Sequence, residues 1–191
     1  MRIISGIYKG RQLAFPRHIR PTQEKVRQAI FNTLAGVWEG ARVLDLFAGS
    51  GALGLEALSR GARDAVFIER DKRSLAVLSQ NAEKLGVGEA AQIFLKNTGL
   101  ALLILEKKQR FFDVVFADPP YHKGLAKKTL QTLGAGGILA NRSFVIIEHG
   151  RQETLPGEEG VLRLFRQARY GLVLVSYYQR SDSRKRQVFP H

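Results

Sequence analysis

The sequence contains no cysteine, which excludes disulfide bonds and metal sites with thiolate ligands and fits an intracellular protein. It has no run of about 18 apolar residues, so no membrane-spanning helix is expected. The first residues, MRIISGIYKGRQ, are charged and lack the apolar stretch of a secretory signal. Internal repeats, low-complexity tracts and long linkers are also missing. We therefore expect a cytoplasmic protein whose 191 residues form one domain, or one domain with a small appendage.

Acidic residues are in the minority, with 17 Asp and Glu against 30 Lys and Arg, and the formal net charge is +13. Such a surplus in a small domain favours a polyanionic partner, because each phosphate that binds a basic side chain releases counterions. The arginines are scattered rather than gathered on one amphipathic helix, which disfavours a membrane surface. Nucleic acid is the predicted partner, and a basic protein without such a partner is the alternative.

Hydrophobic periodicity divides the chain into an N-terminal segment and a region of alternating strands and helices. Residues 1–16 are expected to form a glycine-punctuated hairpin, and 20–36 a helix that begins at Thr22 and ends at Gly36. Strands are predicted at 41–47, 64–69, 91–96, 111–118 and 143–149, with helices at 52–60, 72–86, 100–108 and 124–133. These β-α repeats predict a parallel sheet with both faces covered. Residues 161–180 hold two apolar strands without room for a helix between them, which predicts an antiparallel hairpin on the sheet edge.

The stretch DLFAGSGALGLEAL, residues 45–58, contains Gly49, Gly51 and Gly54 in the G-x-G-x-x-G spacing of a dinucleotide-binding turn. Glu69 follows twenty positions after Gly49, where NAD-binding proteins keep the acid that binds the ribose. Asp45, four positions before Gly49, discriminates between ligands. A pyrophosphate at the start of the next helix would be repelled by this carboxylate, whereas the ammonium group of S-adenosylmethionine would be attracted to it.

The acid at position 45 therefore favours S-adenosylmethionine over NAD as the cofactor. Its ribose hydroxyls would suit Glu69, and its carboxylate would suit the amides that follow Gly49. The alternatives are a tight strand–helix turn without a ligand and, for Glu69 alone, a solvated acid at the start of a helix. Asn97, after the third strand, could reach an adenine or could be an ordinary turn residue.

A second motif, Asp118-Pro119-Pro120-Tyr121, ends the fourth predicted strand. The prolines fix the backbone and donate no hydrogen bonds, so the Pro119 carbonyl can point into a cleft beside the Asp118 carboxylate. Two such acceptors suit an NH₂ group, and Tyr121 offers a flat face to an aromatic ring. The acceptors would aim the lone pair of an exocyclic amine at a methyl sulfonium, and Asp118 could take the released proton. The motif predicts methylation of an amino group on an extruded base, and a proline-stiffened strand end with a surface tyrosine is the alternative.

With both motifs in view, the chain resembles class I S-adenosylmethionine-dependent methyltransferases, and in particular the RsmD family, which methylates N2 of a guanine in bacterial 16S ribosomal RNA. The resemblance rests on RPTQEKVRQAIFNTL, DLFAGSGALGLEALSRGA, FADPPY and IIEH, and covers most of residues 1–180. It implies a Rossmann-like, doubly wound α/β fold with a seven-stranded sheet whose last strand is antiparallel. It also implies a small N-terminal hairpin and helix extension (1–36), a methyltransferase domain (37–180) and a basic tail (181–191). The expected substrate is 16S rRNA within an assembled or partly assembled 30S subunit, and a monomer is expected.

The resemblance also implies roles for individual residues. A cofactor site is expected from Asp45, Phe47, Ala48, Gly49, Ser50, Gly51, Gly54, Glu69, Arg70, Asn97 and Thr98. Catalytic roles are expected for Asp118, Pro119, Pro120 and Tyr121. RNA contacts are expected at Lys9, Arg11, Arg17, Arg20, Thr22 and Arg27. For Arg20, Thr22 and Arg27 the cofactor is the other possible partner, and for the whole set an ordinary solvated basic surface is the alternative. The histidines His18, His122 and His149 lack metal-ligand spacing, so no metal is expected.

Three other functions fit part of the sequence. A DNA adenine-N6 or cytosine-N4 methyltransferase would use the same residues 118–121, although the chain is short for a separate DNA-reading domain. A non-catalytic RNA-binding assembly protein would explain the charge but not the intact second motif. An NAD-dependent oxidoreductase would explain the glycine spacing, but it would not explain Asp45 or the missing hydride-transfer constellation.

Overall fold

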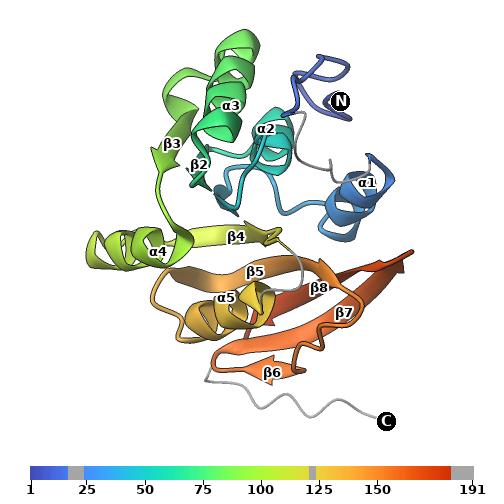
Figure 1. Ribbon diagram of the computed structural model, residues 1–191, viewed down its shortest axis with the longest axis vertical. Helices are drawn as coiled ribbons and strands as arrows, with labels where there is room; N and C mark the ends of the chain where they lie inside the picture. The colour runs from blue at the N-terminus through green and yellow to red at the C-terminus, as the bar shows by residue number, and fades with distance from the viewer. Residues whose placement is uncertain (17–23, 121–123, 182–191) are drawn as a thin grey trace.

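The computed structural model describes residues 1–16, 24–120 and 124–181, which form an eight-stranded sheet with helices on both faces (Figure 1). The strands are β1 (Arg42–Leu46), β2 (Asp64–Glu69), β3 (Ala91–Leu95), β4 (Phe112–Ala117), β5 (Leu139–Gly150), β6 (Glu158–Glu159), β7 (Leu162–Tyr170) and β8 (Val173–Arg180). The helices are α1 (Glu24–Thr33), α2 (Ala52–Ser59), α3 (Lys72–Leu85), the 3-10 turn η1 (Gly88–Ala90), α4 (Thr98–Lys107) and α5 (Leu125–Gly134).

The strand order is β3-β2-β1-β4-β5-β8-β7-β6. Strands β1 to β5 pair in parallel, and β8, β7 and β6 continue the sheet in antiparallel pairing. The direction of winding reverses between β1 and β4, because β2 and β3 extend the sheet to one side and β5 to the other. In doubly wound folds this reversal opens a crevice at the carboxyl ends of the strands, where ligands bind.

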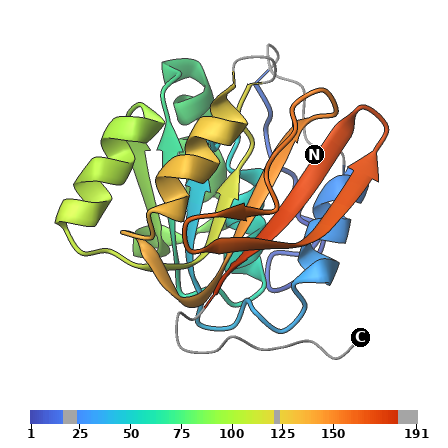
Figure 2. The same cartoon turned by 90° about the horizontal axis from the view of Figure 1, so that it is seen from below.

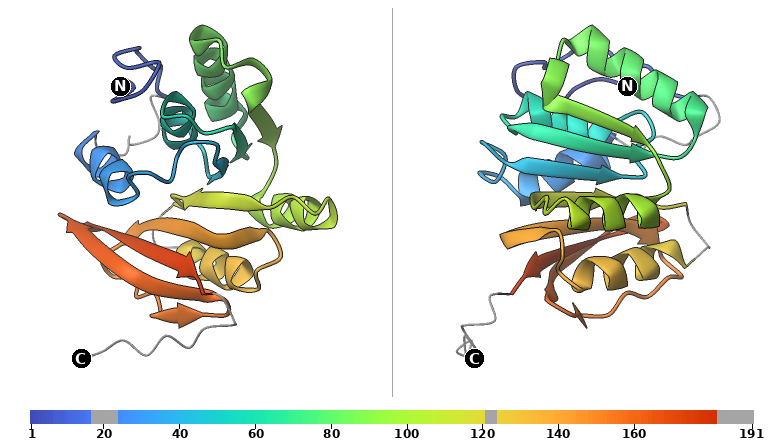
Figure 3. Two further views of the ribbon diagram at one scale, coloured as in Figure 1. Left: turned by 180° about the vertical axis from the view of Figure 1, so that it is seen from behind. Right: turned by 90° about the vertical axis from the view of Figure 1, so that its left-hand side faces the viewer.

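Two apolar cores, one on each face of the sheet, hold the helices in place. Val43 of β1 belongs to one core, and Leu44 and Leu46 belong to the other, as expected where successive strand residues alternate between faces. Helices α1, α2 and α3 pack on the first core. Helices α4 and α5 pack on the second core, and they lie side by side in Figure 3. The nearly continuous apolar runs of β2 and β4, and that of β1 apart from Asp45, follow from burial on both faces.

The predicted doubly wound α/β fold is confirmed, with differences in the antiparallel part. The sheet has one strand more than the seven expected, because Glu158 and Glu159 pair with Arg163 and Leu162 as the short strand β6. Strand β5 begins at 139 rather than 143, since its first residue pairs with Phe112 ahead of a register shift. The hairpin expected within 161–180 forms β7 and β8, and β8 pairs with β5.

The N-terminal segment, residues 1–16, lies against α2 and α3 rather than joining the sheet. Its expected hairpin reduces to one antiparallel bridge, between Arg2 and Gln12. Helix α1 covers the middle of the helix expected at 20–36, and Gly36 has a left-handed φ of 84° three residues after its end. The expected first residue, Thr22, lies outside the described residues. No helix in the described part of the chain is both long and apolar enough to cross a bilayer.

Candidate active site

The two motifs found in the sequence meet at the carboxyl ends of three neighbouring strands. Leu46 of β1 pairs with Ile68 of β2 on one side and with Ala117 of β4 on the other. The loops that follow these strands therefore start level with one another. They carry the glycine motif, the Glu69–Arg70 step and the Asp118 turn, so the register brings together residues from three separate stretches of sequence.

The glycine loop turns sharply between β1 and α2. The N–H of Ala48 donates to the carbonyl of Ile68 at 3.0 Å, and the N–H of Gly51 donates to the carbonyl of Ala48 at 2.7 Å. Phe47 has a φ of 61°, although it is not glycine. A left-handed conformation of a bulky residue costs on the order of 1–3 kcal/mol, and such strain is concentrated at functional sites.

The three glycines of the motif have different surroundings. A Cβ added to Gly51 would lie 2.1 Å from Leu78 Cδ1, and one added to Gly54 would lie 2.3 Å from Phe67 Cε1. A Cβ on Gly49 would meet no atom within 4 Å. Gly51 and Gly54 thus permit close packing of α2 against its neighbours, whereas the loop is open on the side of Gly49, where a ligand could approach the backbone.

Asp45 lies beneath this loop and is almost completely buried, with 2% of its surface exposed. Its Oδ2 accepts a hydrogen bond of 3.0 Å from the N–H of Gly54. Burial raises the pKa of the Asp45 carboxyl to about 8, the Gly54 hydrogen bond opposes this rise, and the nearby Glu69 adds to it. A cation placed beside Asp45 would stabilise the ionised form, so this carboxyl favours a positively charged ligand group.

Glu69, at the end of β2, is also buried, with 8% of its surface exposed. Its Oε2 accepts a hydrogen bond of 2.8 Å from the N–H of Gly49. Its Oε1 accepts hydrogen bonds from the N–H groups of Arg70 and Asp71 at 2.7 and 2.8 Å. The carboxylate is thereby fixed in the crevice, directly against the glycine loop. The cap of helix α3 is a different acid, Asp71, whose side chain accepts from Ser74 N–H.

A pocket beside the loop is formed by residues from four parts of the chain. Four of the residues expected to bind the cofactor line it: Phe47, Arg70, Asn97 and Thr98. Asn97 also caps helix α4, with Oδ1 accepting from Leu100 N–H at 3.3 Å. The far wall of the pocket comes from Leu125, Lys128, Thr129 and Thr132 of α5, which were not expected. Residues 125, 128 and 132 are three and four positions apart, so they share one face of α5. This spacing is the feature of the sequence that could have predicted the wall.

The second motif continues directly from β4. Asp118 is partly exposed, Pro119 is buried and Pro120 is exposed, while Tyr121 lies outside the described residues. Because Ala117 pairs with Ile147 of β5, Asp118 stands level with the buried Glu148 on the neighbouring strand. Among residues 1–16, 24–120 and 124–181, no group of three or more His, Asp or Glu is placed to hold a metal ion.

The residues expected to contact RNA divide into three groups. Lys9 and Arg11 are exposed, but they lie by the ends of α2 and α3 that are remote from the glycine loop, where Arg11 donates to the carbonyl of Lys84 at 3.1 Å. Arg17, Arg20 and Thr22 lie outside the described residues. The RNA contact expected of Arg27 is wrong, because no part of its side chain reaches solvent.

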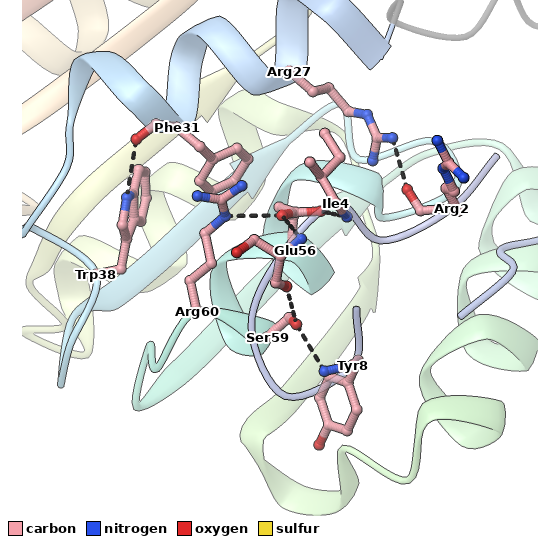
Figure 4. Close-up of polar contacts among 10 residues, drawn as sticks. Arg2, Ile4, Tyr8, Arg27, Phe31, Trp38, Glu56, Ser59 and Arg60 are labelled. Carbon is pink, nitrogen blue, oxygen red and sulfur yellow. Dashed lines mark hydrogen bonds and ion pairs between the residues drawn. The ribbon is translucent and has the colours of Figure 1, made fainter. Parts of the chain in front are cut away.

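Arg27 instead helps to fix the N-terminal segment, which Figure 4 shows in detail. Its Nη2 donates to the carbonyl of Arg2 at 2.8 Å, and burial lowers the pKa of its guanidinium. The sequence held a signal for this burial, since position 27 precedes Phe31 by four residues and shares its helix face.

Glu56 of α2 is the main anchor of the N-terminal segment, and the sequence reasoning missed it. It is fully buried, and its carboxylate accepts from the N–H groups of Ile4 and Ser5 at 2.7 and 3.0 Å (Figure 4). Arg60 supplies the balancing charge, with Nε 2.8 Å from Glu56 Oε1. A single charged residue inside the helix ALGLEALS, which is apolar except for its last residue, is the signal that could have found it, because a buried carboxylate requires partners.

Comparison with known proteins identifies the family. The family described as "Conserved hypothetical protein 95" matches residues 1–179. The chain belongs to this family. An Escherichia coli K12 relative named "Ribosomal RNA small subunit methyltransferase D" is 38% identical over 182 residues, which cover 94% of this chain and 90% of the relative. The solved structure of yhhF from Escherichia coli is 39% identical with a TM-score of 0.83, covering 94% of this chain and 97% of that one.

The fold of this family member extends to more distant proteins. An RNA methyltransferase from Salinibacter ruber, solved in complex with S-adenosyl-L-homocysteine, is 18% identical with a TM-score of 0.62. It covers 90% of this chain and all of that one, and at this identity it shares the fold alone. The family resemblance predicted from the sequence motifs is thus confirmed by the family match and by the relative from Escherichia coli.

Proposed function

We propose that this chain transfers a methyl group from S-adenosylmethionine to the exocyclic N2 amine of a guanine in 16S rRNA of the small ribosomal subunit. The observation that carries the proposal is the register of β1 with β4, which sets the loop above Asp45 beside the turn that begins at Asp118. A cationic methyl donor and an amine acceptor would each meet a carboxylate there. The name of the Escherichia coli relative and the net charge of +13 support rRNA as the substrate.

The residues around the glycine loop fit S-adenosylmethionine. When bound, this cofactor supplies an electrophilic methyl group on a sulfonium. Asp45 is buried without a cation beside it in the described part of the chain, and it would bind the ammonium group of the methionine end. Glu69 is held at the loop by three amide hydrogen bonds and would accept from the ribose hydroxyls. The pocket lined by Phe47 and Thr98 would receive the adenine.

The second motif would hold the acceptor amine. The Asp118 carboxylate and the Pro119 carbonyl would accept hydrogen bonds from the two N–H groups of the guanine N2 amine. This arrangement favours a pyramidal nitrogen with its lone pair free to react. Asp118 would then receive the proton that the methylated nitrogen releases. Pro120 would stiffen the turn. Tyr121 is assigned the stacking face for the extruded base on its place in the motif alone, since it lies outside the described residues.

The wider context of the reaction is part of the same proposal. We assign the protein to the cytoplasm, as a monomer acting on the 30S particle, since its relative is named for the small ribosomal subunit. Residues 37–180 would form the methyltransferase domain and residues 1–36 its extension, with residues 181–191 as a basic tail.

Nucleoside analysis of the methylated product tests the proposal. Small subunits from a bacterial strain that lacks its own member of the family are incubated with the protein and methyl-labelled S-adenosylmethionine, beside naked 16S rRNA and duplex DNA. The RNA is then digested to nucleosides. Label in N2-methylguanosine is the expected result. Label in another nucleoside only, or transfer to duplex DNA in preference to both RNA substrates, would contradict the proposal.

A further inference from the structure

The turn between β7 and β8 presents a large apolar side chain to solvent. Leu172 is 75% exposed, and among the large apolar residues of the described chain only Ile7, at 79%, is more exposed. The turn consists of Gly171 and Leu172 between the paired residues Tyr170 and Val173. Gly171 has a left-handed φ of 64°, which the first position of such a two-residue turn requires. The leucine is therefore set at the apex of a tight hairpin.

This apex is fixed to the sheet rather than loosely attached. Val173 pairs with Gly150 at the end of β5. The N–H of Arg151 donates to the carbonyl of Leu172 at 3.0 Å, and Nε of Arg169 donates to the carbonyl of Gly171 at 3.1 Å. Both residues of the turn are thus held by hydrogen bonds, so the exposed leucine side chain projects from a defined position.

The apex lies at the same end of the strands as the proposed catalytic turn, beyond the carboxyl ends of β4 and β5. Ala117 pairs with Ile147, so Asp118 stands level with Glu148, which pairs with Val175 of β8. Leu172 lies two strands across and three residues further along from Asp118, which corresponds to roughly 14 Å at ordinary strand spacings. Figure 2 shows the red hairpin with its turn on the same side as the loop that follows β5.

The surroundings of the apex are basic. Arg151 and Arg169 are exposed beside the turn, and Arg166 is exposed further along β7, opposite Tyr177. A single exposed leucine is common on protein surfaces and carries nothing by itself. A rigid apolar apex among arginines, beside a site that must receive a base from a folded RNA, matches the devices that separate stacked bases. Such devices combine phosphate contacts with an inserted aliphatic side chain.

We propose that Leu172 is a wedge that enters the base stack of the rRNA when the target guanine is extruded, with the neighbouring arginines on the adjacent phosphates. The inference rests on the proposed function, because only a base-modifying enzyme needs to empty a place in the stack. Extrusion rotates the nucleotide about its backbone, so the emptied place in the stack lies outside the cleft that holds the base. Leu172 would act as a positioning residue, since it fills the gap and does not touch the reacting atoms.

Single-turnover methyl transfer to unmodified 30S particles tests the wedge. At saturating particle, Leu172→Ala should slow transfer about tenfold, because the wedge offsets part of the free energy of unstacking. Leu172→Met keeps the apolar volume and should stay within about twofold of the wild type. Ile7→Ala is the matched control, since Ile7 is similarly exposed but lies far from the glycine loop. Its N–H donates to the carbonyl of Ser59, at the end of α2 that is remote from this loop. Binding of S-adenosylmethionine, measured by calorimetry, should be the same in all four proteins.

The outcomes separate this inference from the proposed function. Transfer by Leu172→Ala at the wild-type rate, or an equal loss in Leu172→Ala and Leu172→Met, would overturn the wedge and leave the methyltransferase assignment standing. Absence of transfer by the wild type would overturn both. Arg151→Gln tests the phosphate contacts and should weaken particle binding several-fold. The slope of the logarithm of the binding constant against the logarithm of salt concentration should become smaller in magnitude by about one. An unchanged salt slope would contradict that part.

Discussion

The carboxylate of Asp45 accepts a hydrogen bond of 3.0 Å from the N–H of Gly54, while only 2% of the residue is exposed. One amide is a weak partner for a buried negative charge, and the pKa of this carboxyl is accordingly raised to about 8. At neutral pH the carboxyl is therefore mainly protonated unless a cation is bound beside it. The first two predictions follow from this property.

Binding of S-adenosylmethionine should release protons when the pH is below about 8, because the ammonium group of the ligand favours the ionised form of Asp45. Calorimetry at pH 7 in two buffers of different ionisation enthalpy measures the release. Asp45→Asn keeps an acceptor for Gly54 N–H but has no proton to lose, so its release should be smaller and its affinity lower. Equal proton release in both proteins would contradict the prediction.

The ligand-free protein should become less stable as pH rises from about 4 to about 8. Over this range the Asp45 carboxyl is protonated in the folded state and ionised in the unfolded state, so folding takes up a proton. Its ordinary pKa is 3.8, and above the folded pKa the whole penalty is present. Urea unfolding measures the free energy of unfolding of both proteins. The value for Asp45→Asn minus that for the wild type should increase by on the order of a few kcal/mol between pH 5 and pH 8.5. Parallel stability curves for the two proteins would show that the folded carboxyl is not protonated.

Asp118→Ala should lower turnover by roughly 10²–10⁴-fold, the usual contribution of a positioned proton acceptor, and leave cofactor affinity within a few-fold of the wild type. Methyl transfer to 30S particles and calorimetry with S-adenosylmethionine provide the two measurements. Asp118→Asn, which keeps one acceptor but removes the charge, should fall between the wild type and the alanine variant. Loss of cofactor binding together with turnover would identify Asp118 as a cofactor ligand or a structural residue.

Gly54→Ala should destabilise the protein by about 1–3 kcal/mol, the usual effect of overpacking a core. The new methyl group would lie 2.3 Å from Cε1 of Phe67, a ring with 0% exposure that has little room to move. Gly99→Ala is the matched control near the start of α4, where the nearest atom, Asn97 Oδ1, is 3.4 Å away. That variant should be neutral or up to about 1 kcal/mol more stable, because alanine favours helix. Equal unfolding midpoints in denaturant for the two variants would contradict the packing role.

Glu56→Gln should destabilise the protein by about 3 kcal/mol or more, since it breaks a buried ion pair with Arg60 and weakens two amide hydrogen bonds. It should also make residues 1–16 more sensitive to protease under native conditions. Glu24→Gln removes the acid of the exposed pair with Arg2 and should change stability by less than about 0.5 kcal/mol. Proteolysis of residues 1–16 at the same rate in both variants would show that Glu56 is not the anchor.

The parts of the structure that could be predicted from the sequence are those that local pattern decides. Apolar runs with β-α spacing gave the order of strands and helices from residue 41 onward, because burial on both faces leaves no other arrangement for them. The glycine loop and the Asp118 turn each follow a strand. Because β1 and β4 are parallel neighbours in the sheet, the fold brings these two segments together at the carboxyl ends of the strands. Their roles as cofactor site and catalytic turn stay predictions until the variants above are measured.

The features that sequence reasoning missed depend on what packs against a helix face. Arginine is a residue type that usually lies on the surface, but the N-terminal segment covers Arg27 and accepts a hydrogen bond from its guanidinium. Glu56 is buried for the same reason. The α5 wall of the pocket required knowing that α4 and α5 share one face of the sheet. The added strand β6 depends on two backbone pairs, which no side-chain pattern encodes.

The anchoring of the N-terminal segment also sets an order of events during synthesis. The carboxylate that binds Ile4 N–H is supplied 52 residues later by Glu56, and the amide that binds Ala14 is supplied 67 residues later by Asn81. The carbonyl of Gln12 accepts from Lys84, 72 residues on. A nascent chain emerges from its N-terminal side, so these three hydrogen bonds cannot form until α2 and α3 have also emerged, whereas Arg27 of α1 is available earlier to the carbonyl of Arg2. Residues 1–16 are therefore synthesised before α2 and α3, but they are fully anchored only after both helices are present.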